Sequence, residues 1–204
     1  MKIVLMGTEE ERKIIFENLQ MLTDDHITYN LETGEVVFSD LPKEEPTSGH
    51  QKGTQLISEL IESDYSINIY SIDKGGSYMT THDFNNSKNG IGTGSNVYLD
   101  INTSPEIPTL DPSTGTVKPE TRPLFISLGH ELCHSYGAMT GTMEEVGYTQ
   151  YTYLDSTKNM KWITTKNEEL VNVGLMGERT ITENDIRKEH GLKLRGSYSW
   201  GEYR

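Results

Sequence analysis

The sequence predicts a single α+β domain over residues 1–204. Segments with helical periodicity alternate along the chain with strand-like segments and hairpin signals, which is typical of this fold class. No internal repeat or shift of composition divides the 204 residues, and this length suits one domain with a sizeable core. Hydrophobic residues make up only 33% of the chain, so we expect long polar loops around that core.

The first 120 residues are predicted to form a sheet and helices with long loops. A helix is expected over residues 8–25, with Thr8 as its N-cap. Its apolar stripe consists of Ile14, Ile15, Leu19 and Leu22. After it we expect a hairpin in which "HITYN" and "EVVFSD" flank "LETG", a loop over 41–53, a helix over 54–64 and a strand over 65–73.

The next segments combine two predicted loops with one strand. Residues 75–94 and 103–123 are rich in Gly, Asn, Ser, Thr or Pro and are expected to be irregular. Between them, "SNVYLDIN" (95–102) alternates as a strand, with Val97, Leu99 and Ile101 on one side. This strand fits either a sheet edge, where an extended peptide could pair with it, or the core of the sheet.

The last third of the chain is predicted to be mainly helical. A helix is expected over "LFISLGHELCHSYG" (124–137), with Gly137 as a left-handed cap. It is followed by a Tyr-rich connection at 148–155, a helical segment at 167–173 and a last helix at 182–190.

Charge and composition exclude several classes of function. The formal net charge of −13 argues against nucleic acid as a partner, because phosphate binding needs clustered Lys and Arg. No apolar run approaches the roughly 20 residues of a membrane helix, and the run at residues 3–6 is too short for a secretory signal peptide. Cys133 is the only cysteine, which excludes a disulfide within the chain. We therefore expect no membrane partner and no export by the general secretory route.

The stretch "GHELCHSYG" (129–137) carries the strongest chemical signal. At about 100° per residue on a helix, His130, Glu131 and His134 share one face, so both imidazoles can reach one ion while the glutamate flanks it. On the same count Leu132 lies about 200° from His130, in the direction of the core, and Cys133 lies at about 300°. We therefore expect Cys133 to be a packed thiol and not a ligand.

The same motif also arises by chance, in roughly one chain in a hundred with this many histidines. The alternative is a pair of packed or surface histidines on a helix. The apolar lead-in "LFISL" favours a buried helix, however, and a buried His pair beside a carboxylate is costly without a metal. The motif therefore predicts zinc with an open position for water, from which Glu131 takes a proton as the water attacks a carbonyl.

The third zinc ligand must come from elsewhere in the chain. A third histidine at HExxHxxGxxH is absent, because Thr140 occupies that position. The other four histidines stand in unrelated contexts, and no separate cysteine motif precedes the helix. A downstream carboxylate is therefore expected. The pair Glu168 and Glu169 in "NEELVNVG" (167–174) stands out, because this run has the apolar spacing of a short buried helix.

Together these motifs resemble a known family. "HELCH", "EELVNVG", "TEN" and "RGSY" form a series that resembles the bacterial NleD-like effector zinc peptidases. The series is more distantly similar to the catalytic light chains of clostridial neurotoxins. The resemblance covers roughly residues 123–198. It implies a zincin-like (gluzincin-type) single domain with a mixed sheet packed on the HExxH helix, in which residues 121–204 form the zinc-site half.

The resemblance implies a complete ligand set. His130, His134 and Glu169 would bind zinc, since the second glutamate of a similar run is the third ligand in the light chains. Glu168 would then be a neighbour that points elsewhere or supports a ligand.

The C-terminal motifs resemble the groups that assist catalysis in the light chains. Arg195 and Tyr198 of "RGSY" match an R-x-x-Y pair that stabilises the negative oxygen developing beside the metal. Glu183 of "TEN" would hold the arginine or a zinc histidine by a charge-assisted hydrogen bond. The alternative is that Arg195 and Tyr198 are ordinary surface residues near the end of the chain.

The function implied by the resemblance is that of a secreted virulence effector. Such a zinc endopeptidase would pass from the bacterial cytoplasm into the host cell cytoplasm without a cleaved signal peptide, as in type III secretion. It would cleave a specific host protein, and NleD-like members point to stress-activated mitogen-activated protein (MAP) kinases such as JNK. Two alternatives are an interbacterial peptidase toxin and a zinc-binding protein without catalysis. The short free-standing chain favours the effector, and the intact Glu131 argues against a purely structural zinc site.

Overall fold

The computed structural model describes residues 2–40 and 49–201, and its main sheet is mixed. In spatial order its strands are β1 (Ile3–Leu5), β4 (Ile67–Ile72), β6 (Ser95–Asp100) and β5 (Tyr78–Thr81). The first three strands run parallel, and β5 joins β6 in antiparallel orientation. β6 is therefore an inner strand, and β5 forms the edge of the sheet.

Three helices pack on one face of this sheet. They are α1 (Glu9–Gln20), α2 (Gln51–Glu62) and α3 (Leu124–Thr140). Alternate strand residues such as Ile69 and Val97 share one buried cluster with Leu56 of α2 and with Leu128 and Leu132 of α3. The opposite face carries a stacked row of aromatic rings, Tyr70, Tyr98 and Tyr78. The period-two pattern of the strands thus separates core from surface.

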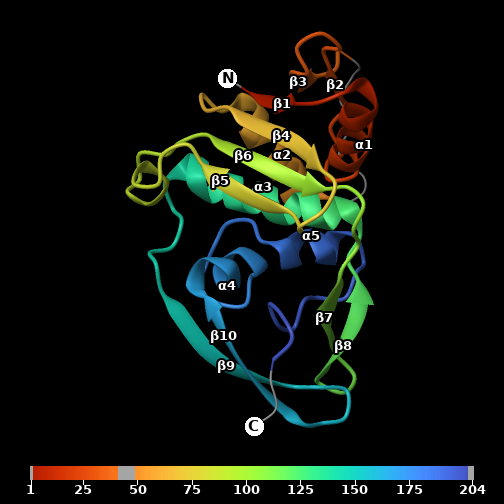
Figure 1. Ribbon diagram of the computed structural model, residues 1–204, viewed down its shortest axis with the longest axis vertical. Helices are drawn as coiled ribbons and strands as arrows, with labels where there is room; N and C mark the ends of the chain where they lie inside the picture. Colours follow the sequence, from red (N-terminus) through yellow and green to blue (C-terminus); the bar gives the residue numbers. More distant parts are fainter. Residues whose placement is uncertain (1, 41–48, 202–204) are drawn as a thin grey trace.

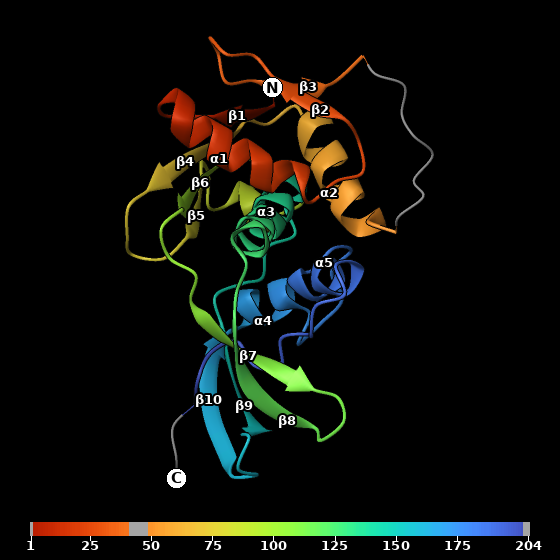
Figure 2. The same ribbon diagram turned by 90° about the vertical axis from the view of Figure 1, so that its right-hand side faces the viewer.

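A second group of elements lies on the other side of α3, so that this helix runs through the middle of the molecule (Figures 1 and 2). The group contains two antiparallel hairpins and two short helices. They are β7 (Glu106–Asp111) with β8 (Thr116–Thr121), β9 (Tyr148–Leu154) with β10 (Met160–Lys166), α4 (Asn167–Val173) and α5 (Glu183–Glu189). A third hairpin, β2 (Ile27–Tyr29) with β3 (Val36–Phe38), and a 3-10 turn, η1 (Asn86–Lys88), complete the described elements.

Most helices and one hairpin agree with the sequence prediction. Thr8 caps α1 and forms a capping box with Glu11, although the helix ends at Gln20 and not at residue 25. In its predicted stripe only Ile14 is exposed. α4 and α5 occupy the expected ranges, and α5 begins with Thr182 as its N-cap. Residues 41–48 of the predicted loop lie outside the described residues.

Three segments predicted as irregular contain strands. β5 lies in the predicted loop at 75–94, and none of its four residues is buried, so it lacks the hydrophobic alternation by which a strand is recognised. The loop predicted at 103–123 forms the β7–β8 hairpin, in which Pro108 and Pro119 face each other in register. This arrangement places both missing amide donors at one point of a two-stranded ribbon. The Tyr-rich connection is strand β9, paired along its length with β10.

The prediction that Gly137 ends the central helix is wrong. α3 continues to Thr140, and Gly141, with φ of 69°, adopts the left-handed conformation at its end. A Cβ atom at Gly137 would lie 3.2 Å from the guanidinium carbon of Arg179. The glycine inside the helix thus leaves room for the guanidinium of Arg179, which packs close to the backbone at this point.

The α+β class and the mixed sheet packed on α3 are confirmed. Of the two positions left open for residues 95–102, the inner one is correct, because β6 pairs with β4 and β5 on its two sides. None of the helices in the described ranges combines the length and the apolar character required to cross a membrane.

Candidate metal centre and active site

α3 presents His130, Glu131 and His134 on the face that points away from the core. His130, Glu131 and His134 are 3%, 4% and 6% exposed, and the two imidazole rings stand edge to face with centroids 4.9 Å apart. Leu132 and Cys133 are fully buried in the hydrophobic cluster. The helical spacing thus separates the metal-binding face from the core face, and the expectation that Cys133 is a packed thiol is confirmed. Burial raises the pKa of this thiol.

Glu169 closes the metal-binding cluster from the first turn of α4. Its Oε2 lies 3.1 Å from Nε2 of His134 and 3.3 Å from Nε2 of His130. One potential ligand atom from each of the three residues lies within 4.8 Å of the other two. The approach of α4 to α3 therefore brings together two imidazoles and one carboxylate, a set of donors that suits zinc.

Each histidine is oriented by a second carboxylate. Nδ1 of His130 lies 2.8 Å from Oε2 of Glu183, and Nδ1 of His134 lies 2.9 Å from Oε1 of Glu168. Because an ionised carboxylate only accepts, each Nδ1 donates to its supporting carboxylate, and each Nε2 is directed to the cluster, where it can bind a metal ion once it has lost its own proton. Burial opposes the charge of His134, but its hydrogen bonds with Glu168 and Glu169 raise its pKa to about 10. The residues fit a zinc ion on the chemistry of these donors.

Arg179 connects the supports of both histidines. It donates to both oxygens of Glu168 at 2.8 and 2.9 Å, and to Oδ1 of Asn172 at 3.1 Å. The amide of Asn172 in turn donates to the carbonyl of His130 at 3.0 Å. Burial opposes the charge of Glu168, but its hydrogen bonds with His134 and Arg179 lower its pKa to about 2. Glu168 is therefore an ionised acceptor that holds His134 from behind.

Glu183, at the start of α5, is fully buried and contacts one histidine and two arginine side chains. Its Oε2 accepts from His130 and, at 2.7 Å, from Nη1 of Arg195, while Oε1 lies 3.4 Å from Nη1 of Arg187. Burial opposes its charge, but Arg195 and His130 hold the pKa of this carboxyl well below its usual range. Both options left open for Glu183 are thus found in the structure, since it contacts the arginine and the histidine.

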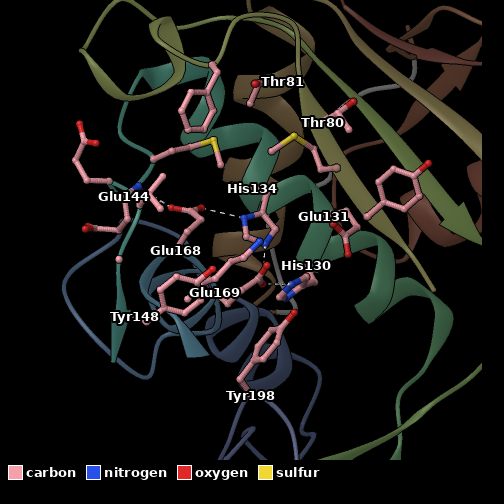
Figure 3. A pocket seen from close by; sticks show the side chains of 18 of the residues that line it. Thr80, Thr81, His130, Glu131, His134, Glu144, Tyr148, Glu168, Glu169 and Tyr198 are labelled. Carbon is pink, nitrogen blue, oxygen red and sulfur yellow. Dashed lines mark hydrogen bonds and ion pairs between the residues drawn. The ribbon is translucent and has the colours of Figure 1, made fainter. Parts of the chain in front are cut away.

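The C-terminal segment brings Arg195 and Tyr198 to the same place. It is tied down by a hydrogen bond from the amide of Gly196 to the carbonyl of Pro108 and by one from the amide of Tyr198 to the hydroxyl of Tyr151. Arg195 donates through Nη2 to the carbonyl of Tyr198. Figure 3 shows the ring of Tyr198 directed toward His130 and Glu169. Burial and the charge of Glu169 raise the pKa of Tyr198, so its phenol stays protonated and can donate.

A cavity of about 650 Å³ lies in front of the metal cluster (Figure 3). One wall is the edge strand β5, including Thr80 and Thr81, and the other is the segment 143–148 before and at the start of β9. His130, Glu131, His134, Glu169 and Tyr198 all line it. A polypeptide segment lying along β5 would therefore pass directly over the three metal-binding residues and Glu131.

Several residues of the site were not singled out from the sequence. Arg179 and Asn172 lie in unremarkable contexts, although Asn172 is three positions after Glu169 on the same helix, a spacing that places two side chains on one face. The walls of the cavity come from segments whose strand character was not recognised. Their placement depends on pairing between distant segments, for which the sequence carries no short-range signal.

The site combines two histidines four residues apart on a buried helix with a carboxylate as the third candidate ligand. Glu131 flanks these ligands. This combination is typical of a zinc metalloprotease centre. A profile of the Peptidase_M91 family, described as "Effector protein", matches residues 45–198. The chain therefore belongs to this family of effector proteins. The family name describes its members as peptidases, and in this chain His130, His134 and Glu169 are the candidate ligands of a zinc ion.

Solved structures with some similarity to the chain include three light chains of botulinum neurotoxins. The serotype C1 light chain protease has 12% identity and a TM-score of 0.37, with 84% of this chain and 42% of that chain covered. The zinc-free type C light chain has 14% identity and a TM-score of 0.38, with 85% of this chain and 41% of that chain covered. The serotype HA light chain has 11% identity and a TM-score of 0.39, with 90% of this chain and 45% of that chain covered. The chain thus spans less than half the length of these light chains. No curated protein sequence matches it.

Proposed function

We propose that the protein is a gluzincin-type zinc endopeptidase that acts as a bacterial effector and cleaves a specific protein of the host cell. The observation that carries this proposal is the convergence of His130, Glu131, His134 and Glu169 on one cavity that is open to a polypeptide. A purely structural zinc site needs no flanking carboxylate and no such cavity.

Glu131 is the proposed proton carrier. Zinc, when bound, would supply Lewis-acid polarisation of the attacking water and of the scissile carbonyl. Glu131 lies next to His130 on α3 and lines the same cavity. It accepts the proton that water loses on attack and delivers it to the leaving amine, as a general base and then a general acid.

Tyr198 and Arg195 are proposed to stabilise the negative charge that develops on the carbonyl oxygen. The phenol of Tyr198 is protonated and faces the metal-binding residues, so it is the direct donor. Arg195 is held by Glu183 and binds the backbone of Tyr198. Its role is therefore to fix the position of Tyr198 and to add positive charge behind it.

The family and the resemblance of the motifs support a proposal for the substrate class. The Peptidase_M91 description as effector protein supports delivery into a host cell, and the motifs resemble those of the NleD-like peptidases. We therefore propose host stress-activated MAP kinases, such as JNK, as substrates in the host cytoplasm.

The test is to incubate the zinc-loaded protein with host-cell lysate and to map new protein N-termini, with Glu131→Ala as the control. We expect a small set of cleaved proteins that includes a MAP kinase, and a loss of cleavage of at least about 1,000-fold in the variant. Undiminished cleavage by Glu131→Ala would disprove its role as the base. Cleavage in bacterial lysate alone would instead favour an interbacterial toxin, and the absence of cleavage in both lysates would refute the peptidase proposal.

A further inference from the structure

Arg122 lies beside the active site and differs from the other buried arginines of the protein. Arg179 pairs with Glu168, while Arg187 and Arg195 share Glu183. Arg122 is only 9% exposed. Within residues 2–40 and 49–201, its side chain has no ion-pair partner, and its Nε is buried without a hydrogen bond.

The position of Arg122 is fixed by the backbone on both sides. It stands between the end of β8 at Thr121 and the start of α3 at Leu124. Its amide donates to the carbonyl of Pro105 at 2.9 Å. The guanidinium is therefore carried to the active site by two regular elements and not by a loose loop.

Arg122 lines a second hollow of about 270 Å³ next to the main cavity. The two hollows share Ser77, His130, Glu131 and Tyr198 as lining residues. A substrate bound across the metal-binding residues would thus place one part in the larger cavity and a neighbouring side chain in the smaller hollow.

Two arginines, Arg122 and Arg195, and two glutamates, Glu106 and Glu131, line this hollow. The carboxylate nearest to Arg195, Glu183, is already shared with Arg187 and His130. Within residues 2–40 and 49–201, no carboxylate forms an ion pair with Arg122, so its charge remains available to an anion of the substrate. A largely buried guanidinium without an ion-pair partner is unfavourable, and an anion that binds with good geometry would offset this cost. A carboxylate or a phosphate can accept two parallel hydrogen bonds from a guanidinium.

We propose that the smaller hollow is a subsite for an anionic substrate residue next to the scissile bond, and that Arg122 binds its carboxylate or phosphate oxygens. The inference rests on the proposed peptidase function and makes it more specific. Arg122 would be a specificity-determining residue, because removal of its charge weakens only those substrates that carry the anion.

The first test compares cleavage of a proteome-derived peptide library by the zinc-loaded wild-type protein and by Arg122→Gln. Wild-type cleavage sites should be enriched in Asp, Glu or a phosphorylated residue at one position beside the scissile bond. A phosphatase-treated portion of the library distinguishes phosphate from carboxylate, since only a preference for phosphate disappears. Arg122→Gln should lose the enrichment, and Arg122→Lys should retain part of it.

A matched pair of peptides gives the quantitative readout. For a peptide with the anionic residue, Arg122→Gln should lower kcat/KM about 10- to 100-fold. For the same peptide with Gln or Asn at that position, kcat/KM should change less than about threefold. An equal loss on both peptides would overturn the proposal, because it would indicate a general role in catalysis or folding. Cleavage without any anionic preference in the wild-type protein would overturn it as well.

A binding measurement separates this inference from the proposed function. Glutarate and inorganic phosphate are titrated into the zinc-loaded proteins, and the rise in Tm is compared. At least one anion should raise the Tm of the wild-type protein clearly more than that of Arg122→Gln and Arg122→Met. Anion binding at zinc is common to all three proteins, so the difference in the Tm shift reports binding at Arg122. Equal stabilisation would refute the subsite even if the protein is a peptidase. An Arg122-dependent rise without any peptide cleavage would leave the anion site standing and refute the peptidase proposal.

Discussion

At the scale of single residues, the metal centre depends on side chains that touch no metal. Arg179 binds Glu168, which holds His134, and it also binds Asn172, which donates to the carbonyl of His130. Partners of this kind set the orientation and proton position of a histidine ligand. We therefore assign Arg179 a positioning role that extends to both histidines.

The affinity for zinc should fall most in the variant whose replaced residue directly contacts the metal-binding histidines through its ligand oxygen. Glu169→Ala should lose zinc, because its oxygen lies within 3.3 Å of both Nε2 atoms. Glu168→Ala and Arg179→Ala should both retain zinc at saturating concentrations but bind it about 10- to 100-fold more weakly. Competition with a chromophoric chelator measures these affinities, with the exposed Glu145→Ala as the control. If Glu168→Ala loses more zinc than Glu169→Ala, the ligand is Glu168.

At the scale of elements, α3 is the helix on which the rest of the molecule is built. Its one face packs on the sheet and on α1 and α2, and its other face meets α4 and α5. Gly137 leaves room for the approach of Arg179, and Gly141 allows the left-handed conformation at the end of the helix. A polar contact also crosses to α2, where the hydroxyl of Tyr136 donates to Oε2 of Glu59 at 2.8 Å.

This contact between α2 and α3 predicts a pH dependence of stability. Burial and the Glu59 carboxylate raise the pKa of Tyr136 to about 12. A tyrosine with a raised pKa stabilises the fold while its phenol is neutral, so the contribution is complete below pH 10 and is lost as the pH rises through 12. Tyr136→Phe should lower the free energy of unfolding by about 1 kcal/mol at pH 8.

Urea denaturation from pH 8 to 12 measures this difference. The gap between the wild-type protein and Tyr136→Phe should shrink as the pH approaches 12. Tyr148→Phe, a change at an exposed tyrosine, should show no such dependence. A gap that stays constant over this pH range would mean that the hydrogen bond does not contribute.

At the scale of the whole molecule, the N-terminal segment is part of the domain although the family match begins at residue 45. Ile15, Leu19 and Leu22 belong to the same buried cluster as Leu128 of α3. A Cβ atom at Gly129 would lie 3.3 Å from a methyl group of Leu22, so this segment packs directly against the helix of the metal site. Strand β1 also pairs with β4 in the main sheet.

A chain that lacks residues 1–40 should therefore fail to form the metal site. Removal of residues 1–40 exposes the side of the core that faces α1. Each large apolar side chain that is left uncovered lowers the free energy of unfolding by about 1.5–3 kcal/mol. We expect loss of cooperative thermal unfolding and of stoichiometric zinc binding, measured by calorimetry and elemental analysis. Glu131→Ala serves as the folded control. A truncated chain that unfolds cooperatively with zinc bound would show that residues 41–204 suffice.

The sequence by itself determined the features that depend on local geometry. The 3.6-residue period of a helix puts His130, Glu131 and His134 on one face regardless of what surrounds them, and Thr8 and Thr182 cap their helices through contacts three residues away. Helices α4 and α5 were recognisable for the same reason. These elements are specified by neighbours in the chain, so no knowledge of distant segments is required.

Only the tertiary structure decided how distant segments meet. Strands β5, β7 and β9 exist because partners pair with them, and their own residues show little hydrophobic alternation. The distinction between Glu168, which supports His134, and Glu169, which faces both histidines, depends on how α4 approaches α3. The burial of Arg122 beside the active site without a carboxylate partner is likewise a consequence of packing. The physical reason is that contact across a fold is set by the relative placement of elements, which short-range sequence patterns do not encode.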